Sequence, residues 1–264
     1  MRVRRLRRLH PLRVIALALL VALAACQTVP VTGRSQLLLI PEGTELQMGL
    51  DSYHQVLSKA RVSTDPRLNE QVTRVGKRIA AATGRTDYQW EFKVLEDKQV
   101  NAFCLPGGKV AVYTGIMPVA QDDAGLAAVL GHEVSHAIAR HGGERLSQTL
   151  LVQTGLTATQ AALANRDPVT VQAVGALLGA GASVGLLLPW SRGQESEADH
   201  LGLIYMAKAG YHPKAARDLW VRMEEAAKGS SKPPEFLSTH PSPERRIQQI
   251  DAWIPEALTY YTPR

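Results

Sequence analysis

The chain carries no excess of basic charge outside its first residues. Six of its 30 Lys and Arg residues fall within residues 1–25, where there is no acidic residue. Setting those six aside leaves 24 basic residues against 24 acidic ones, so the rest of the chain is formally neutral. A nucleic-acid-binding protein normally presents a strongly basic face. The charge balance therefore argues against a nucleic-acid partner.

Long hydrophobic runs are also scarce. Val14–Ala25 is an unbroken apolar run of 12 residues, whereas a transmembrane helix needs about 20. The run follows a start rich in arginine, and this combination is typical of an exported precursor. We therefore predict a signal peptide over residues 1–25, followed by a chain long enough for one large domain.

The apolar run ends in Leu23-Ala24-Ala25-Cys26, which resembles a bacterial lipobox. The resemblance implies cleavage before Cys26 and lipid on its sulfur and new amino terminus. A plain signal peptide followed by a chance cysteine is the alternative. Gln27, rather than Asp, favours the outer membrane by the usual sorting pattern. We therefore expect residues 26–40 to be a lipidated tether and leader, anchored in the outer membrane of a Gram-negative bacterium and facing the periplasm.

Cysteine is nearly absent, because the chain has only Cys26 and Cys104. If Cys26 carries lipid, no intramolecular disulfide can form, even in an oxidising compartment. Cys104 is then either a catalytic nucleophile or a small buried apolar side chain. The second interpretation is favoured, since free cysteine is among the most buried residue types.

What the chain does contain is a His-Glu-x-x-His motif, formed by His132, Glu133 and His136. Apolar residues recur around it at helical spacing, and four residues advance a helix by just over one turn. Both imidazoles therefore project from one side of a rigid helix, which can pre-arrange half of a tetrahedral zinc site. Glu133 would sit beside the open metal position and take a proton from water there.

Flanking signals predict the surrounding elements. Asp122 and Asp123 can cap the start of the motif helix, and Gly142-Gly143 can end it. Trp90–Leu95 and Val110–Tyr113 alternate as strands do. Further helices are expected near residues 41–60, 65–82, 146–164 and 195–209. The expected fold is mostly α with a small antiparallel β-sheet (α+β), in a single domain over residues 41–264.

The segment between the two strands allows two interpretations. Asn101, Ala102 and Phe103 precede a Pro-Gly-Gly turn, so they can belong to a purely structural hairpin. Alternatively they form an edge strand that pairs with the extended backbone of a substrate beside the metal. The pattern alone leaves both open, and these three residues are our candidates for substrate binding.

Residues 168–191 contain no charged side chain, and their glycines recur at small-xxx-small spacing. A membrane hairpin is one interpretation. The glycines and the polar side chains make the segment weaker than a true membrane span. We therefore expect a buried helix that packs closely against the motif helix.

A catalytic zinc needs three protein ligands and one open position. The metzincin spacing is excluded, because Ala139 and Gly142 stand where that motif needs Gly and His. A glutamate from a second helix is the alternative, and Glu195 is the candidate. Asp199, four residues on, would share its face and could hold the other nitrogen of a ligand histidine. Spacing alone equally allows a solvated charged face.

Taken together, four motifs resemble the HtpX and CaaX-prenyl endopeptidase family of gluzincins. They are Asn-Ala-Phe-x-Leu-Pro-Gly-Gly, Leu-Gly-His-Glu-x-x-His, Glu-x-x-Ala-Asp and Thr-His-Pro with a later Arg-Ile, in the family's order. The chain is most similar to the exported lipoprotein branch, since it has no clear transmembrane helices. The resemblance implies one zinc ion per chain and a role at the zinc site for each of five residues. The metal ligands would be His132, His136 and Glu195, the base Glu133, and the outer partner Asp199.

The same resemblance gives meaning to His240 and Arg246. At the family's spacing both face the active site, where they can stabilise the oxyanion or, for His240, reach the metal. Without the resemblance, His240 would be interpreted as a loop histidine and Arg246 as a charge on a helix surface. We expect Glu197 to be exposed to solvent and His141 to have a structural role only.

The sequence thus predicts a zinc metalloendopeptidase that cleaves misfolded or unassembled proteins of the cell envelope, as part of protein quality control. The competing hypothesis is a self-inhibited or chaperone-like lipoprotein with little turnover.

Overall fold

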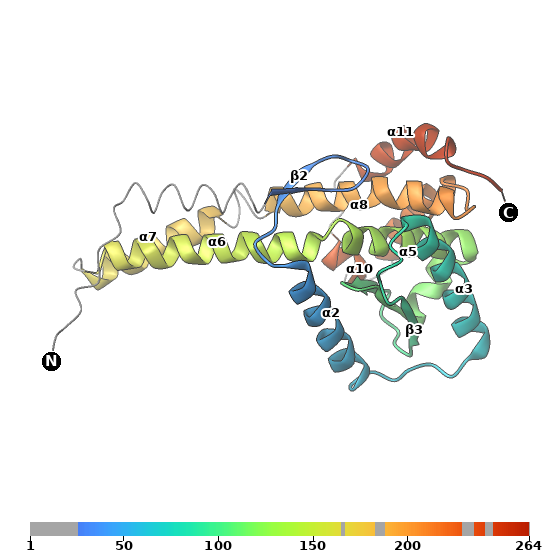
Figure 1. Ribbon diagram of the computed structural model, residues 1–264, viewed down its shortest axis with the longest axis horizontal. Helices are drawn as coiled ribbons and strands as arrows, with labels where there is room; N and C mark the ends of the chain where they lie inside the picture. The colour runs from blue at the N-terminus through green and yellow to red at the C-terminus, as the bar shows by residue number, and fades with distance from the viewer. Residues whose placement is uncertain (1–25, 165–166, 183–187, 229–234, 241–244, 264) are drawn as a thin grey trace.

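Figure 1 shows the computed structural model of the chain, which describes residues 26–164, 167–182, 188–228, 235–240 and 245–263. The predicted signal peptide lies outside the described residues. The strands are β1 (Cys26–Thr28), β2 (Ser35–Leu37), β3 (Glu91–Leu95), β4 (Ala102–Leu105) and β5 (Lys109–Tyr113). The helices are α2 (Glu42–Leu57), α3 (Pro66–Thr83), α4 (Met117–Ala120), α5 (Asp123–Ile138), α6 (His141–Ala162), α7 (Pro168–Ala182), α8 (Leu188–Lys208), α9 (Lys214–Lys228), α10 (Glu235–Thr239) and α11 (Arg246–Leu258), with one 3-10 turn at Thr114–Ile116.

The expected α+β class is confirmed, but the main sheet is mixed rather than antiparallel. Its strand order is β3-β5-β4; β4 and β5 are antiparallel, and β3 and β5 are parallel. The turn at residues 106–108 joins β4, not β3, to β5, so β5 returns between them in the direction of β3. The expectation of a fully antiparallel sheet was wrong because it paired the first and last strands through that turn.

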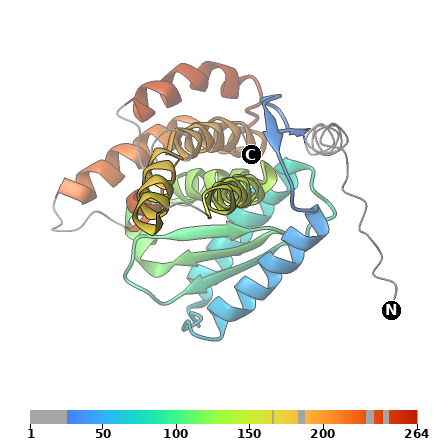
Figure 2. The same cartoon turned by 90° about the vertical axis from the view of Figure 1, so that its left-hand side faces the viewer.

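Two long helices form the centre of the molecule. The sheet lies with α2 on one face and α5 on the other, and α8 packs on α5 (Figure 2). The two helices approach closely at Gly131 and Gly202, since a Cβ on Gly131 would stand 2.9 Å from the carbonyl oxygen of Gly202. Absence of a side chain at this contact therefore lets α8 lie directly along α5, next to the His-Glu-x-x-His motif.

The start of α5 is as predicted, but its end is not. The carboxylate of Asp122 accepts a hydrogen bond from the backbone N–H of Gly125 at 2.8 Å, as an N-cap should. The helix ends at Ile138, four residues before the expected glycines, because Arg140 adopts the left-handed conformation with φ 56°. The guanidinium of Arg140 pairs with Glu45 at 2.6 Å, so a buried ion pair holds this break.

Beyond the break, α6 and α7 project from the body as an arm (Figure 1). The expectation of a buried helix against α5 over residues 168–191 was wrong for α7, which packs on α6 and exposes Val169 (71%) and Leu177 (74%). Residues 183–187 of that stretch lie outside the described residues. Small residues permit close packing but do not choose the partner helix. Across the described part of the chain, no helix combines the length and apolarity that crossing a membrane requires.

The leader before α2 is folded onto the body. β1 and β2 form an antiparallel pair, and Val29 and Leu38 are buried. The backbone N–H of Leu39 donates to the hydroxyl of Ser147 on α6 at 2.8 Å. The stretch predicted to be a tether and leader therefore contacts α6, the helix that follows the motif helix.

Candidate metal centre

The motif residues lie on the most deeply buried helix of the described chain. His132, Glu133 and His136 are exposed by only 3%, 3% and 7%, and every residue of α5 from Gly125 to Ile138 is buried. A polar side chain in such surroundings is costly unless it is paired or binds a metal. The burial of all three therefore indicates a specific site rather than a solvated helix face.

Helix α8 supplies the carboxylates. Glu195 is fully buried, and Asp199, one helical turn later, is 5% exposed. Both project toward α5 because the glycine contact draws the two helices together. The alternative of a solvated charged face is thus contradicted for this pair.

Four side chains converge within one small volume. His132, His136, Glu195 and His240 each present one ligand atom, and these four atoms all lie within 4.8 Å of one another. Nε2 of His132 and Nε2 of His136 are 3.2 Å apart, and each lies 3.4 Å from a carboxylate oxygen of Glu195. Two atoms bound to one tetrahedral zinc at about 2.0 Å are separated by roughly 3.3 Å. The donor set and its spacing therefore fit zinc.

His240 closes the group from the end of α10. Its Nδ1 lies 3.2 Å from Nε2 of His132 and 3.0 Å from Oε2 of Glu195. Its Nε2 faces Oε1 of Glu133 at 3.4 Å. The structure thus brings His240, predicted from a distant loop, between the candidate ligands and the candidate base.

Glu133 has the environment of a proton acceptor. Among the described residues no group hydrogen-bonds to its buried Oε1. Burial raises the pKa of Glu133, while His240 and His132 act in the opposite direction. A carboxylate with a raised pKa accepts protons more readily near neutral pH than an exposed one does.

Asp199 and Arg246 lie behind His132. Nδ1 of His132 is 2.9 Å from Oδ1 of Asp199, which in turn accepts a hydrogen bond from Arg246 at 2.7 Å. Burial opposes ionisation of Asp199, but Arg246 and His132 together outweigh burial and lower the pKa of the carboxyl group. The guanidinium of Arg246 also stacks over the ring of Trp220 at 3.4 Å, and the side chain is 1% exposed. Arg246 therefore orients Asp199 and is not free to face a substrate in this conformation.

His141 and Glu197 belong to the same group of buried side chains, which the sequence did not indicate. His141 is fully buried and Glu197 is 7% exposed, whereas we expected an exposed Glu197. Hydrogen bonds from His141, Thr32 and Arg34 outweigh burial and lower the pKa of Glu197 to about 2. Glu197 fills a variable position of the Glu-x-x-Ala-Asp motif, and His141 lies outside the four motifs. Their contacts arise from the break at Arg140 and from the folded leader.

The residues expected to bind substrate form the edge of the sheet. Asn101 precedes β4, and β4 pairs with β5 on one side only within the described chain. The backbone N–H of Tyr113 donates to the carbonyl of Asn101, so in this antiparallel ladder Phe103 also bonds toward β5. The N–H and C=O groups of Ala102 and Cys104 therefore point toward the free edge. Since β4 packs on α5, that edge runs beside the motif helix.

The two cysteines differ as expected. Cys104 is half-buried against the core, and burial raises the pKa of its thiol well above the usual value, with the Glu133 charge adding to the shift. A thiol with a raised pKa is a poor nucleophile, which favours the apolar interpretation. Cys26 is exposed, so its predicted lipid attachment is sterically possible and stays a prediction.

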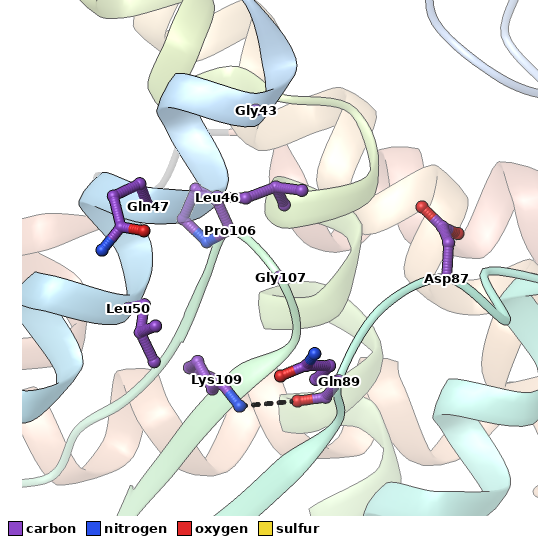
Figure 3. Close-up of a pocket in the computed structure, with 9 residues that line it drawn as sticks. All are labelled: Gly43, Leu46, Gln47, Leu50, Asp87, Gln89, Pro106, Gly107 and Lys109. Atoms are coloured by element: carbon purple, nitrogen blue, oxygen red, sulfur yellow. Dashed lines mark hydrogen bonds between the residues drawn. The ribbon is translucent and has the colours of Figure 1, made fainter.

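A separate hollow lies on the far side of the sheet, between α2 and the turn before β5 (Figure 3). Gly43, Leu46, Pro106 and Lys109 are among its lining residues, and the amine of Lys109 donates to the backbone carbonyl of Gln89 at 2.8 Å. None of the converging histidines or glutamates lines it. The hollow is therefore distinct from the candidate metal centre.

The fold and the centre together define the gluzincin class of zinc metallopeptidases: a His-Glu-x-x-His helix, with a glutamate supplied by a second helix. Residues 66–254 match Peptidase family M48, and the chain belongs to that family. The predicted enzyme class, a zinc metalloendopeptidase, and zinc as its cofactor are thereby confirmed.

Curated relatives come from mitochondria and from bacteria. The chain is 40% identical over 232 residues to Mitochondrial metalloendopeptidase OMA1 of Schizosaccharomyces pombe, covering 87% of this chain and 66% of the relative. The same-named protein of Saccharomyces cerevisiae is 32% identical over 254 residues, covering 88% and 70%. Beta-barrel assembly-enhancing protease of Escherichia coli (strain K12) is 28% identical over 228 residues, covering 84% and 46%.

These relatives bear on two predictions, the location of the protein and its family. The predicted location in the outer membrane of a Gram-negative bacterium is contradicted, because the relatives of 40% and 32% identity are mitochondrial enzymes. The prediction rested on a few residues around Cys26, outside the region that carries the family's chemistry. The predicted family is confirmed as Peptidase family M48. The narrower prediction, of the HtpX and CaaX-prenyl endopeptidase type and its exported lipoprotein branch, is not confirmed by these relatives.

Proposed function

We propose that this chain is an endopeptidase which cuts extended segments of unfolded or unassembled proteins, with His132, His136 and Glu195 as its zinc ligands. The observation that carries the proposal is the convergence of these three buried side chains at the spacing of a tetrahedral zinc site, with Glu133 beside them.

The chain's own residues have distinct parts in the hydrolysis. Zinc, when bound, supplies Lewis-acid polarisation of the scissile carbonyl and lowers the pKa of water at the site. Glu133 accepts the proton of the attacking water and delivers it to the leaving amine, a role supported by its raised pKa. Asp199 keeps the His132 ring oriented through its 2.9 Å bond to Nδ1.

Charge that develops on the carbonyl oxygen needs a nearby donor. His240 is the better candidate, because it lies at the centre and is partly exposed. Arg246 was expected to share this role, but its ion pair with Asp199 supports a positioning role instead. Hydrogen-bond donation to an oxyanion is usually among the largest contributions to acyl-transfer catalysis.

The substrate is expected to bind as an added strand. The outward C=O of Ala102 and the outward N–H and C=O of Cys104 offer donors and acceptors that any extended peptide can match. Recognition through the main chain selects for unfolded segments rather than for a particular sequence. The predicted candidates Asn101 and Phe103 then act by shaping this edge. Oδ1 of Asn101 accepts a hydrogen bond from the N–H of Ala102 at 2.9 Å.

The name of one relative supports the substrate class. The Escherichia coli relative is named a beta-barrel assembly-enhancing protease, and this name is consistent with a substrate that is not yet assembled. The chain spans only part of each relative's length, so their partners do not follow from the match.

A direct test is to incubate the purified, zinc-loaded chain with an unfolded polypeptide such as casein, and with a folded protein of similar size. We expect internal fragments from casein alone, loss of cleavage with a zinc chelator, and recovery when zinc is restored. Release of single terminal residues, or equal cleavage of the folded protein, would contradict the proposal.

A second candidate, a self-inhibited peptidase, is favoured by the place of His240. Its Nδ1 completes the group of ligand atoms at 3.2 Å and 3.0 Å from its neighbours, spacings that suit a fourth zinc ligand. An imidazole there excludes the attacking water. The His240 ring must then swing away before cleavage.

Binding of a small zinc-directed inhibitor to the His240→Ala variant distinguishes the two candidates. Self-inhibition predicts tighter inhibitor binding than in the wild type, while His212→Ala, at a remote histidine, behaves as the wild type does. Equal inhibitor affinity with lower turnover would leave His240 as an oxyanion donor only.

A further inference from the structure

The ring of His136 has both nitrogens engaged. Its Nε2 faces the ligand group, and its Nδ1 lies 2.9 Å from Nδ1 of His141. A hydrogen bond between two imidazole nitrogens needs one donor and one acceptor. A metal-ligating Nε2 carries no proton, so the proton of His136 is on Nδ1 and is donated to His141.

This assignment fixes the state of His141 as well. With its Nδ1 accepting, the proton of the neutral ring is on Nε2, which lies 3.0 Å from Oε2 of Glu197. His141 is fully buried, so both of its ring nitrogens need partners within the protein. Every donor in this chain of hydrogen bonds therefore meets an acceptor.

Glu197 is in turn fixed by the leader. Its carboxylate accepts from the hydroxyl of Thr32 and from Nε of Arg34, the latter at 2.8 Å. Arg34 also makes a bidentate bond to Glu144 on α6, with both distances 2.8 Å. The guanidinium thus ties the leader to α8 and α6 at once, and leaves no free rotation for the Glu197 carboxylate.

The two motif histidines are supported in parallel ways. Behind His132 stand a carboxylate and an arginine, Asp199 and Arg246. Behind His136 there are also a carboxylate and an arginine, Glu197 and Arg34, but the ring of His141 lies between them and His136. The arginine on the second side comes from the leader, which precedes the residues matched by the family.

We propose that His141 and Glu197 are positioning residues for the zinc ligand His136, and that Arg34 of the leader holds them in place. The leader is then part of the scaffold of the metal centre. This inference rests on the proposed function, since it takes His136 as a ligand. Outer partners of this kind typically contribute 10- to 100-fold to metal affinity.

A purely structural network is the competing explanation, and zinc affinity separates the two. The zinc dissociation constant is measured by competition with a chromophoric chelator, at a temperature well below the melting temperature of each zinc-free variant. His141→Leu is expected to weaken zinc binding by about 10- to 100-fold, with Glu197→Gln and Arg34→Gln weakening it in the same direction by less. Cobalt substitution gives a second readout, because a displaced His136 ring alters the visible absorption of the bound ion.

The chain offers matched controls in His200 and Glu256, a second histidine–glutamate pair. Nε2 of His200 lies 2.7 Å from Glu256, and His200 shares α8 with Glu197. His200→Leu and Glu256→Gln should leave zinc affinity unchanged. If His141→Leu does not fold, the two outer variants decide. Folded Glu197→Gln and Arg34→Gln proteins that bind zinc as tightly as the wild type would overturn the inference. A wild type without tight zinc binding would instead overturn the proposed function.

Discussion

At the scale of single residues, the centre is built from buried charges that compensate one another. Glu195 is fully buried, and the facing histidines outweigh the effect of burial and lower the pKa of its carboxyl group. A buried carboxylate without such partners would be protonated. The same side chains that keep Glu195 ionised are therefore those that converge with it on the metal position.

Substitutions at Glu195 and Asp199 should show which of the two carboxylates contributes more to zinc affinity. Glu195→Ala removes a proposed ligand and should abolish tight zinc binding. Asp199→Ala leaves the ligands but frees the His132 ring, and should weaken binding by roughly 10- to 100-fold. Zinc content after dialysis against a weak chelator measures both. Loss of zinc from Asp199→Ala with retention by Glu195→Ala would reverse the assigned roles.

Residues on a local motif could be predicted, and residues that meet through the fold could not. Helical spacing predicts the roles of His132, Glu133 and His136. The supporting role of Asp199 could be predicted because it lies one helical turn after Glu195. His141 follows His136 by five residues, which a continuous helix would place on another side. Only the left-handed Arg140 turns the chain so that the His141 ring meets Nδ1 of His136.

At the scale of elements, helix starts were predictable, whereas the end of α5 and the packing partners of the elements were not. Asp65 before Pro66 begins α3, and Asp122 begins α5, because a carboxylate cap acts on the adjacent backbone. Strand direction in the sheet and the packing of α7 depend on contacts far along the chain. Hydrophobic pattern alone therefore gave the fold class, but neither the parallel pair nor the arm.

The edge strand gives a prediction that belongs to this scale. Cys104→Pro removes one outward N–H, which proline tolerates at a sheet edge, whereas Cys104→Ala keeps it. We expect Cys104→Pro to raise the KM for an extended peptide substantially and Cys104→Ala to leave it close to that of the wild type.

Zinc content and melting temperature verify that both Cys104 variants are folded. Equal KM values for two folded variants would mean that the substrate does not pair with β4.

At the scale of the whole molecule, the metal centre joins segments that are far apart in the sequence. The leader, α5, α8 and the end of α10 all contribute side chains to one buried group. Folding and zinc binding should therefore be coupled, since an unfolded chain cannot present these ligands together.

The coupling predicts a change in thermal stability. At free zinc about 100-fold above its dissociation constant, binding adds about 2.7 kcal/mol to the free energy of unfolding. For a chain of this size that raises the melting temperature by roughly 5–10 °C over the zinc-free protein. Calorimetry with and without a chelator measures the difference. Identical melting temperatures would mean that zinc binds the folded chain no more tightly than the unfolded one, which would contradict the coupling.

Cleavage by the Glu133→Gln variant tests the central claim most directly. The substitution leaves His132, His136 and Glu195 untouched but removes the proton acceptor. The account predicts one zinc ion per chain in both proteins, and a loss of casein cleavage by about 10²- to 10⁴-fold in the variant. Near-normal cleavage by zinc-loaded Glu133→Gln would contradict it.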